Sequence, residues 1–202
     1  VHDGHIHLIE EYLKKGNNID IIISGSPREG ISPESSYNFL TKIFKNPKLR
    51  KNRNDENNPN VNIEISKDNS PMLTAINKVK NAKSGTFALA SSTKQGDETR
   101  SLDFKKKFEK GKSSYNPNVN VIKLNVDAEP LYYHNRTDQY NDKPISSTII
   151  RRDIRNNDFD NFFKSYENIM KNYKISGNDI KEYYDIIRNE LLPIKESSLY
   201  DD

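Results

Sequence analysis

The chain contains no cysteine, so it forms neither disulfide bonds nor thiolate metal sites. It also has no apolar run near the roughly 18 residues that a membrane-spanning helix needs, and no signal-type leader. Neither sign of charge dominates, because 32 Lys and Arg stand against 29 Asp and Glu, for a net charge of +3. We therefore expect a soluble, cytoplasmic protein with no membrane partner and no nucleic-acid partner.

The length of 202 residues suits one α/β domain with a buried core. Only 33% of the residues are hydrophobic and 30% are charged, which predicts a modest core with long polar loops. A concentrated basic run covers residues 42–53, and Asp55 and Glu56 follow it directly. This alternation favours a solvated loop over a phosphate-binding arm.

Helical and strand-like patterns alternate along the chain. The apolar spacing predicts helices over 4–15, 37–44, 72–79 and 102–108. It also predicts two C-terminal helices, one over about 147–172 with a possible break and one over 178–191. Short β-branched or apolar runs predict strands over 19–24, 60–65, 86–90 and 119–126, with loops over 24–35 and 91–98. Strands that alternate with helices favour a mainly parallel sheet whose ligands lie at the carboxyl ends of the strands.

The first motif that could carry chemistry is His2-Asp3-Gly4-His5, at the point where the first helix is expected to begin. Two imidazoles, a glycine that permits close backbone approach and the free N–H groups of a helix start would suit a polyphosphate. A chance occurrence and a two-histidine metal site are the alternatives. His7 projects from another face of the helix, so we expect it to be structural or exposed.

The second motif is Ile145-Ser146-Ser147-Thr148-Ile149-Ile150-Arg151, with three hydroxyls where a helix is expected to start and a guanidinium one turn later. Hydroxyls and backbone N–H groups can hold phosphate oxygens, and an arginine can bind them through two nitrogens. Taken alone, the segment is better explained by an ordinary Ser/Thr cap before an amphipathic helix.

Together, HDGH at 2–5 and ISSTIIR at 145–151 resemble the HxGH and ISSTxIR signatures of the nucleotidylyltransferase superfamily. The second signature is closer to the form of nicotinamide or nicotinate mononucleotide adenylyltransferases than to the RTxGxST form of cytidylyltransferases. Residues 23–28 with 35–40, and 96–100 with 103–104, also resemble nucleotidyltransferases encoded by large bacteriophages, which would place the protein in a host cytoplasm. The family has a strand and a Gly-x-Phe-x-Pro type turn before HxGH, so we expect residues to be missing upstream of Val1.

The resemblance implies a Rossmann-like three-layer α/β sandwich over residues 1–157, with C-terminal helices over 158–202 packed on it. It also implies transfer of AMP from ATP to a phosphorylated acceptor such as nicotinamide mononucleotide, with Mg²⁺ bridging phosphate oxygens and pyrophosphate leaving. Transfer of CMP to a phospho-alcohol or sugar phosphate is the alternative enzyme. A nucleotide-binding or structural phage protein without turnover is the alternative from another class, and any of these could form homo-oligomers.

The resemblance also assigns roles. His2 and His5 would hold the triphosphate and Arg151 would clamp the leaving pyrophosphate, while Gly4, Ser146, Ser147 and Thr148 would line the phosphate site. The residues that follow the 19–24 strand, Ser24, Ser26 and Arg28, could contact the acceptor or the nucleotide, or could form a simple turn. Weaker candidates are Asp97 and Arg100, which surface polarity explains slightly better, and the loop residues Tyr132, Tyr133 and His134, for which an ordinary loop is favoured.

Overall fold

The computed structural model describes residues 1–44, 61–68, 70–90, 97–123, 129–173 and 175–192. The chain divides into two compact units. We call Val1–Asp3, Ser26–Lys51 and Tyr132–Asp202 the helical unit, and Gly4–Gly25 with Asn52–Leu131 the strand unit. Each unit is described by itself.

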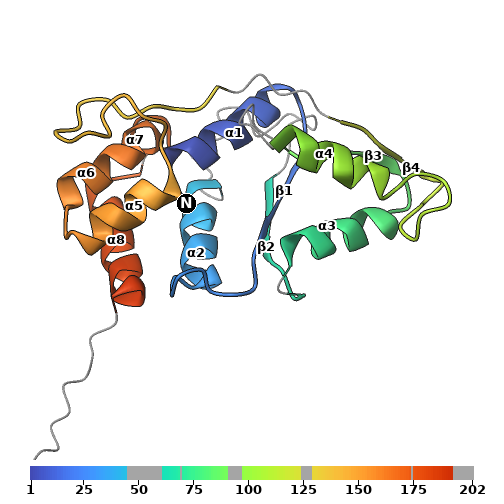
Figure 1. Ribbon diagram of the computed structural model, residues 1–202, viewed down its shortest axis with the longest axis horizontal. Coiled ribbons are helices and arrows are strands. Elements are labelled where there is room, and N and C mark those ends of the chain that lie inside the picture. The colour runs from blue at the N-terminus through green and yellow to red at the C-terminus, as the bar shows by residue number, and fades with distance from the viewer. Residues whose placement is uncertain (45–60, 69, 91–96, 124–128, 174, 193–202) are drawn as a thin grey trace, which may run out of the picture. The chain divides into compact units, whose positions relative to one another are not determined.

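The strand unit holds four short strands, which pair in parallel (Figure 1). Strand β1 (Ile19–Ile23) pairs with β2 (Val61–Ile65), with Ile21 opposite Ile63. Strand β3 (Gly85–Phe87) pairs with β4 (Val119–Val121), with Thr86 opposite Asn120. In the described residues these strands form two separate two-stranded sheets rather than one continuous sheet.

Three helices accompany these strands. Helix α1 (Asp3–Lys14) begins within the first motif, and Gly16 follows its last turn with φ +79°, a conformation that glycine adopts without strain. Helix α3 (Pro71–Lys80) is capped by the Ser70 hydroxyl and has proline at its first position. Helix α4 (Asp97–Lys106) packs with α3, β3 and β4 around a small core of Val79, Phe104, Phe108 and Val121.

The helical unit contains α2 (Pro33–Phe44), α5 (Ser147–Arg155), α6 (Phe159–Phe163), the 3₁₀ turn η2 (Lys164–Tyr166), α7 (Glu167–Asn172) and α8 (Gly177–Leu191). Its core is aromatic: the rings of Phe39 and Tyr183 stack with centroids 4.0 Å apart, and Tyr166 packs edge-on against both. A capping box of Ser176 and Asp179 starts α8. Such packing stabilises helices that are individually short.

The sequence predicts the parallel pairing and most helices correctly, and several boundaries are wrong. Helix α2 begins at Pro33, within the stretch expected to be a loop, because proline at the first helical position loses no hydrogen bond and the Ser32 hydroxyl accepts the Ser35 N–H. Helix α4 begins at Asp97 and ends at Lys106, rather than spanning 102–108. Strand β3 is three residues long, shorter than predicted. Strand β4 ends at Val121, and residues 124–126 of the strand predicted there lie outside the described residues.

The protein is thus a mixed helix and strand chain with small parallel sheets. The helical unit contains helices from both sides of residue 157. The predicted division into a core over 1–157 and C-terminal helices over 158–202 stays a prediction. The basic run beyond Phe44 lies outside the described residues; Lys42 lies in α2, where it pairs with Asp179 at 2.6 Å. None of the helices in the described ranges is long and apolar enough to cross a membrane.

The helical unit encloses an ion pair between Arg136 and Asp153, both with no exposed side-chain surface. We expect Asp153→Ala to lower the free energy of unfolding by about 3 kcal/mol, because it leaves buried guanidinium donors without their acceptor. Urea unfolding measures this change. The matched control is Asp185→Ala, which removes an exposed pair with Lys181 and should cost below about 1 kcal/mol. Equal losses from the two variants would contradict the assignment of Asp153 as a core element.

Candidate functional site

The second motif forms the start of α5. Ser146 has extended backbone angles, φ −143° and ψ 148°, and its hydroxyl accepts the Ile149 N–H at 3.4 Å. The helix cap, which is the alternative to a phosphate site, is therefore present. The next two hydroxyls belong to Ser147, which is half-buried, and Thr148, which is exposed. Because a cap uses only the Ser146 hydroxyl, those two hydroxyls are not needed to start the helix.

Arg151, one turn into α5, is held by a carboxylate. Its Nε lies 3.0 Å from Glu29 Oε2, and the Arg155 guanidinium lies 2.8 Å from the same oxygen. The hydrogen bond from Arg155, together with the charges of Arg151 and Arg28, lowers the pKa of Glu29. Three arginines thus act on one exposed carboxylate, which leaves a local excess of positive charge.

Glu29 sits at the tip of a tight turn. Arg28 and Ile31 exchange both backbone hydrogen bonds, at 3.0 and 3.1 Å, and the two residues between them, Glu29 and Gly30, have φ of 53° and 91°. Two successive residues with positive φ define a type I′ turn. A Cβ on Gly30 would lie 2.9 Å from the Glu190 carbonyl oxygen, so the turn packs directly on α8.

A second carboxylate fixes the far end of this loop. Glu190 accepts hydrogen bonds from the Ser32 N–H, the Ser32 hydroxyl and the Ser35 hydroxyl, at 3.0, 2.6 and 2.7 Å. Burial raises the pKa of Glu190, but these hydrogen bonds outweigh it and the pKa is lowered. The loop that carries Ser26 and Arg28, both exposed, is therefore tied to α5 by Glu29 and to α8 through Ser32.

The first motif is anchored in the helical unit by its first residues. The Asp3 carboxylate accepts the N–H groups of Asn168 and Ile169, both at 2.9 Å, and the Tyr166 hydroxyl donates to the Val1 carbonyl at 2.8 Å. His2 is 5% exposed.

Most of the predicted site therefore lies in one unit. The residues in the helical unit are His2, Ser26, Arg28, Ser146, Ser147, Thr148 and Arg151. Gly4, His5 and Ser24 belong to the strand unit, where His5 is exposed in the first turn of α1. The functional roles that the resemblance gives these residues stay predictions.

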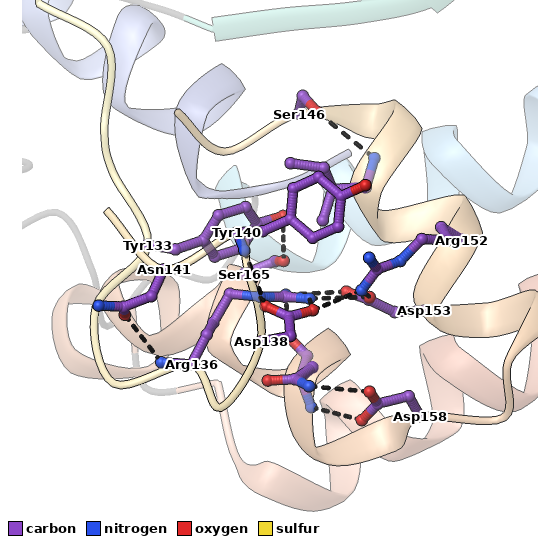
Figure 2. A network of polar contacts seen from close by, with 12 residues as sticks. Tyr133, Arg136, Asp138, Tyr140, Asn141, Ser146, Arg152, Asp153, Asp158 and Ser165 are labelled. Carbon is purple, nitrogen blue, oxygen red and sulfur yellow. Dashed lines mark hydrogen bonds and ion pairs between the residues drawn. The ribbon is translucent and has the colours of Figure 1, made fainter. Parts of the chain in front are cut away.

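A buried polar network beneath the start of α5 was not predicted from the sequence (Figure 2). Arg136 uses all five of its N–H donors, on both oxygens of Asp138, both oxygens of Asp153 and the Asn161 carbonyl, at 2.8 to 2.9 Å. These bonds outweigh the effect of burial and raise the pKa of Arg136. Arg152 also pairs with Asp138, whose pKa is held well below its usual range by these guanidinium groups.

The same network reaches the second motif through Tyr133. Burial raises the pKa of the Tyr133 hydroxyl, and hydrogen bonds with the Ser165 hydroxyl and the Ser146 backbone partly offset this rise. The Ser165 hydroxyl donates to the Tyr133 hydroxyl oxygen at 3.0 Å. Tyr133 is one of the loop residues considered for stacking on a base, but it is fully buried and supports the start of α5 instead. The sequence signal for the network was Asp153, an acidic residue directly before a buried isoleucine of an amphipathic helix.

The weaker candidates lie apart from this cluster. Tyr132 is 44% exposed, and His134 forms an exposed pair with Asp142 at 3.5 Å. Asp97 and Arg100 lie in the first turns of α4, in the strand unit. Among the residues that the structure describes, no group of three or more His, Cys, Asp or Glu could hold a metal ion.

Comparisons with protein-family models, with curated proteins and with solved structures found no match to this chain.

Gly30 provides a test of the loop geometry. We expect Gly30→Ala to destabilise the protein by about 1–2 kcal/mol more than Gly111→Ala, as measured by urea unfolding. Both residues have nearly the same positive φ, 91° and 89°, but a Cβ at Gly111 would meet nothing within 4 Å. The shared backbone strain therefore cancels, and the difference reports the close approach to α8. Losses of the same size would show that the loop yields without cost.

Proposed function

We propose that the protein is a nucleotidyltransferase that transfers AMP from ATP to a phosphorylated acceptor, with nicotinamide mononucleotide as the leading candidate. The observation that carries the proposal is the arginine cluster at α5. Arg151 of the ISSTIIR segment shares Glu29 with Arg155, and the charge of Arg28 acts on the same carboxylate. Guanidinium groups in excess of carboxylates suit the oxygens of a phosphate chain.

The chemistry would be an in-line displacement. A phosphate oxygen of the acceptor attacks the α-phosphorus of ATP, the bond from that phosphorus to the bridging oxygen breaks, and pyrophosphate leaves with the bonding electron pair. Positioning and charge stabilisation then supply the catalysis, without a covalent intermediate on the protein. In this scheme Arg151 binds the leaving pyrophosphate, His2 and His5 stabilise the charge on the bridging oxygen, and the start of α5 holds the terminal phosphates.

Mg²⁺ would enter with the triphosphate as part of the substrate. This ion commonly binds phosphate oxygens and waters with one or two protein carboxylates, so it does not need the three-ligand group that the described residues lack. The proposal also entails that the small parallel sheets belong to a Rossmann-like sandwich, with Gly4, Ser24, Ser26 and Arg28 contributing to binding of nucleotide or acceptor.

One observation favours a second candidate, a nucleotide-binding protein without turnover. The Arg151 side chain is 11% exposed and already paired, and His2 is buried. A triphosphate that binds Arg151 must displace the Glu29 carboxylate from it. A protein that does only this would bind nucleotide without catalysing transfer. Turnover and binding therefore need separate measurements.

Pyrophosphate release with each NTP, Mg²⁺ and a panel of acceptors tests the enzyme. Release with ATP and nicotinamide mononucleotide supports the adenylyltransferase, and release with CTP and a phospho-alcohol or sugar phosphate supports the cytidylyltransferase instead. ATP binding by calorimetry without release under any condition supports the second candidate. If neither pyrophosphate release nor ATP binding is detected, all three candidates are ruled out.

For the active enzyme, we expect His5→Ala to lower kcat by roughly 10²-fold or more, because it removes stabilisation of the charge that develops on the leaving oxygen. The control is His7→Ala, since His7 lies in the same helix, two residues beyond His5, and the resemblance gives it no role. That variant should keep the rate of the unmodified protein. An unchanged rate in His5→Ala would reject the catalytic role of His5.

We also expect Glu29→Gln to tighten ATP binding by up to about fivefold, because the neutral side chain competes less well for Arg151 than the carboxylate does. The effect is limited because an exposed ion pair contributes little to the free energy. Glu34→Gln is the control, because it removes a carboxylate from the nearby, exposed start of α2. Weaker ATP binding in Glu29→Gln would mean that Glu29 orients Arg151 for the ligand rather than competing with it.

A further inference from the structure

Exposed lysines lie in two segments of the strand unit, one at the end of α3 and one from the last turn of α4 into the turns that follow it. The six lysines that we call the basic surface are all exposed: Lys80, Lys83, Lys105, Lys107, Lys110 and Lys112. Two acidic residues, Asp103 and Glu109, are interspersed among them, and Asp103 pairs with a seventh lysine, Lys106, at 3.4 Å. In the described part of the chain, the side chains of the six lysines form no ion pair. The local charge is therefore strongly positive, although the whole chain carries only +3.

The packing of α4 forces these lysines outward. Phe104 and Phe108 are 3% and 7% exposed and belong to the core that also contains Val79 of α3. Because these aromatic residues point inward, the three lysines between them, at 105–107, are left at the surface. After α4 the chain continues in tight turns, in which the Lys112 N–H donates to the Glu109 carbonyl and the Tyr115 N–H to the Lys112 carbonyl, each at 3.0 Å.

Asn116 brings the two groups of lysines together. Its side-chain nitrogen donates to the carbonyls of Lys80 and Ala82, at 2.9 and 2.8 Å. The turns that carry Lys110 and Lys112 are thereby fastened to the end of α3, close to Lys83. The basic surface is a fixed feature of the strand unit, built from two segments some 30 residues apart in the sequence.

Tyr115 supplies an aromatic ring within this surface. It is 41% exposed, although it directly precedes the anchored Asn116 and lies three residues from Lys112. A large exposed ring beside unpaired lysines is the combination by which proteins bind single-stranded nucleic acids: cations neutralise phosphates and aromatic rings stack on unpaired bases. Basic charge alone attracts anionic lipids only weakly, and stable docking on a membrane takes an apolar anchor as well, whereas the exposed ring here has a polar hydroxyl.

We propose that the basic surface binds single-stranded nucleic acid, with the lysines on the phosphates and Tyr115 on a base. The small overall charge argues against such a partner, but association depends on the local field, and the acidic residues of the chain are concentrated elsewhere. This inference is independent of the proposed nucleotidyl transfer, because none of the residues of the basic surface is among those assigned to the nucleotide site.

The test is fluorescence anisotropy with a labelled 20-nucleotide oligo-dT, measured over a series of salt concentrations on the full chain. The variant Lys105→Gln, Lys107→Gln, Lys110→Gln should weaken binding at least tenfold at low salt. It should also reduce the slope of log affinity against log salt by about 2, because each phosphate that is no longer neutralised accounts for roughly 0.7 of that slope. Tyr115→Ala should weaken binding roughly tenfold and leave the salt slope unchanged, because stacking releases no counterions.

The control has the same change of charge at another place: Lys15→Gln, Lys143→Gln, Lys171→Gln, at three exposed lysines outside the basic surface. It should bind as the unmodified chain does. Equal loss in the control, or no binding of the oligonucleotide at low salt, would overturn the proposal. Full binding by Tyr115→Ala, or equal affinity for a duplex, would also overturn it. Loss of binding to phosphatidylserine vesicles in the lysine variant, with oligonucleotide binding intact, would assign the surface to membranes instead.

Discussion

The buried pair of Arg136 and Asp153 is the constraint on which the helical unit depends. A guanidinium with no exposed surface costs several kcal/mol to desolvate, so it is tolerated only where every donor finds an acceptor. Here the acceptors come from the 132–144 loop, from α5 and from α6. Satisfying one arginine therefore fixes three segments relative to one another, including the one that leads into Ser146.

The carboxylates at the edge of this unit act in a related way on the 26–32 loop. Glu29 draws the loop to the arginines of α5, while Glu190 holds its other end at the start of α2. Glu29 does so through ion pairs, and Glu190 does so through hydrogen bonds. If the phosphate site is as we propose, Glu29 is also the group that any anionic ligand must compete with, so that loop and ligand draw on the same arginines.

The sequence predicted local structure well where a single segment decides it. The start of α1 within the first motif and the Ser/Thr cap at the start of α5 follow from short-range chemistry, and both are present. It did not predict the role of Arg136 or Glu29. The buried partner Asp153 lies 17 residues from Arg136, and Arg155 lies 126 residues from Glu29, so nothing local distinguishes these two residues from surface charges. The length of β3 was overestimated for a similar reason. An apolar run in the sequence indicates a strand, but the length of that strand depends on its pairing with residues far away in the sequence.

Helix α5 sorts its charges by rotation. Arg151 and Arg155, one turn apart, both pair with Glu29. Asp153 instead forms the buried pair with Arg136, and Arg152 pairs with Asp138 in the same network. Inserting one residue after Ser147 would turn everything beyond it by about 100°, which places Arg152 where Asp153 now lies and Asp153 where the buried Ile154 now lies. The spacing from the serines to Arg151 is therefore fixed by folding as well as by any ligand. A chain that lost the phosphate site would still be constrained to keep that spacing.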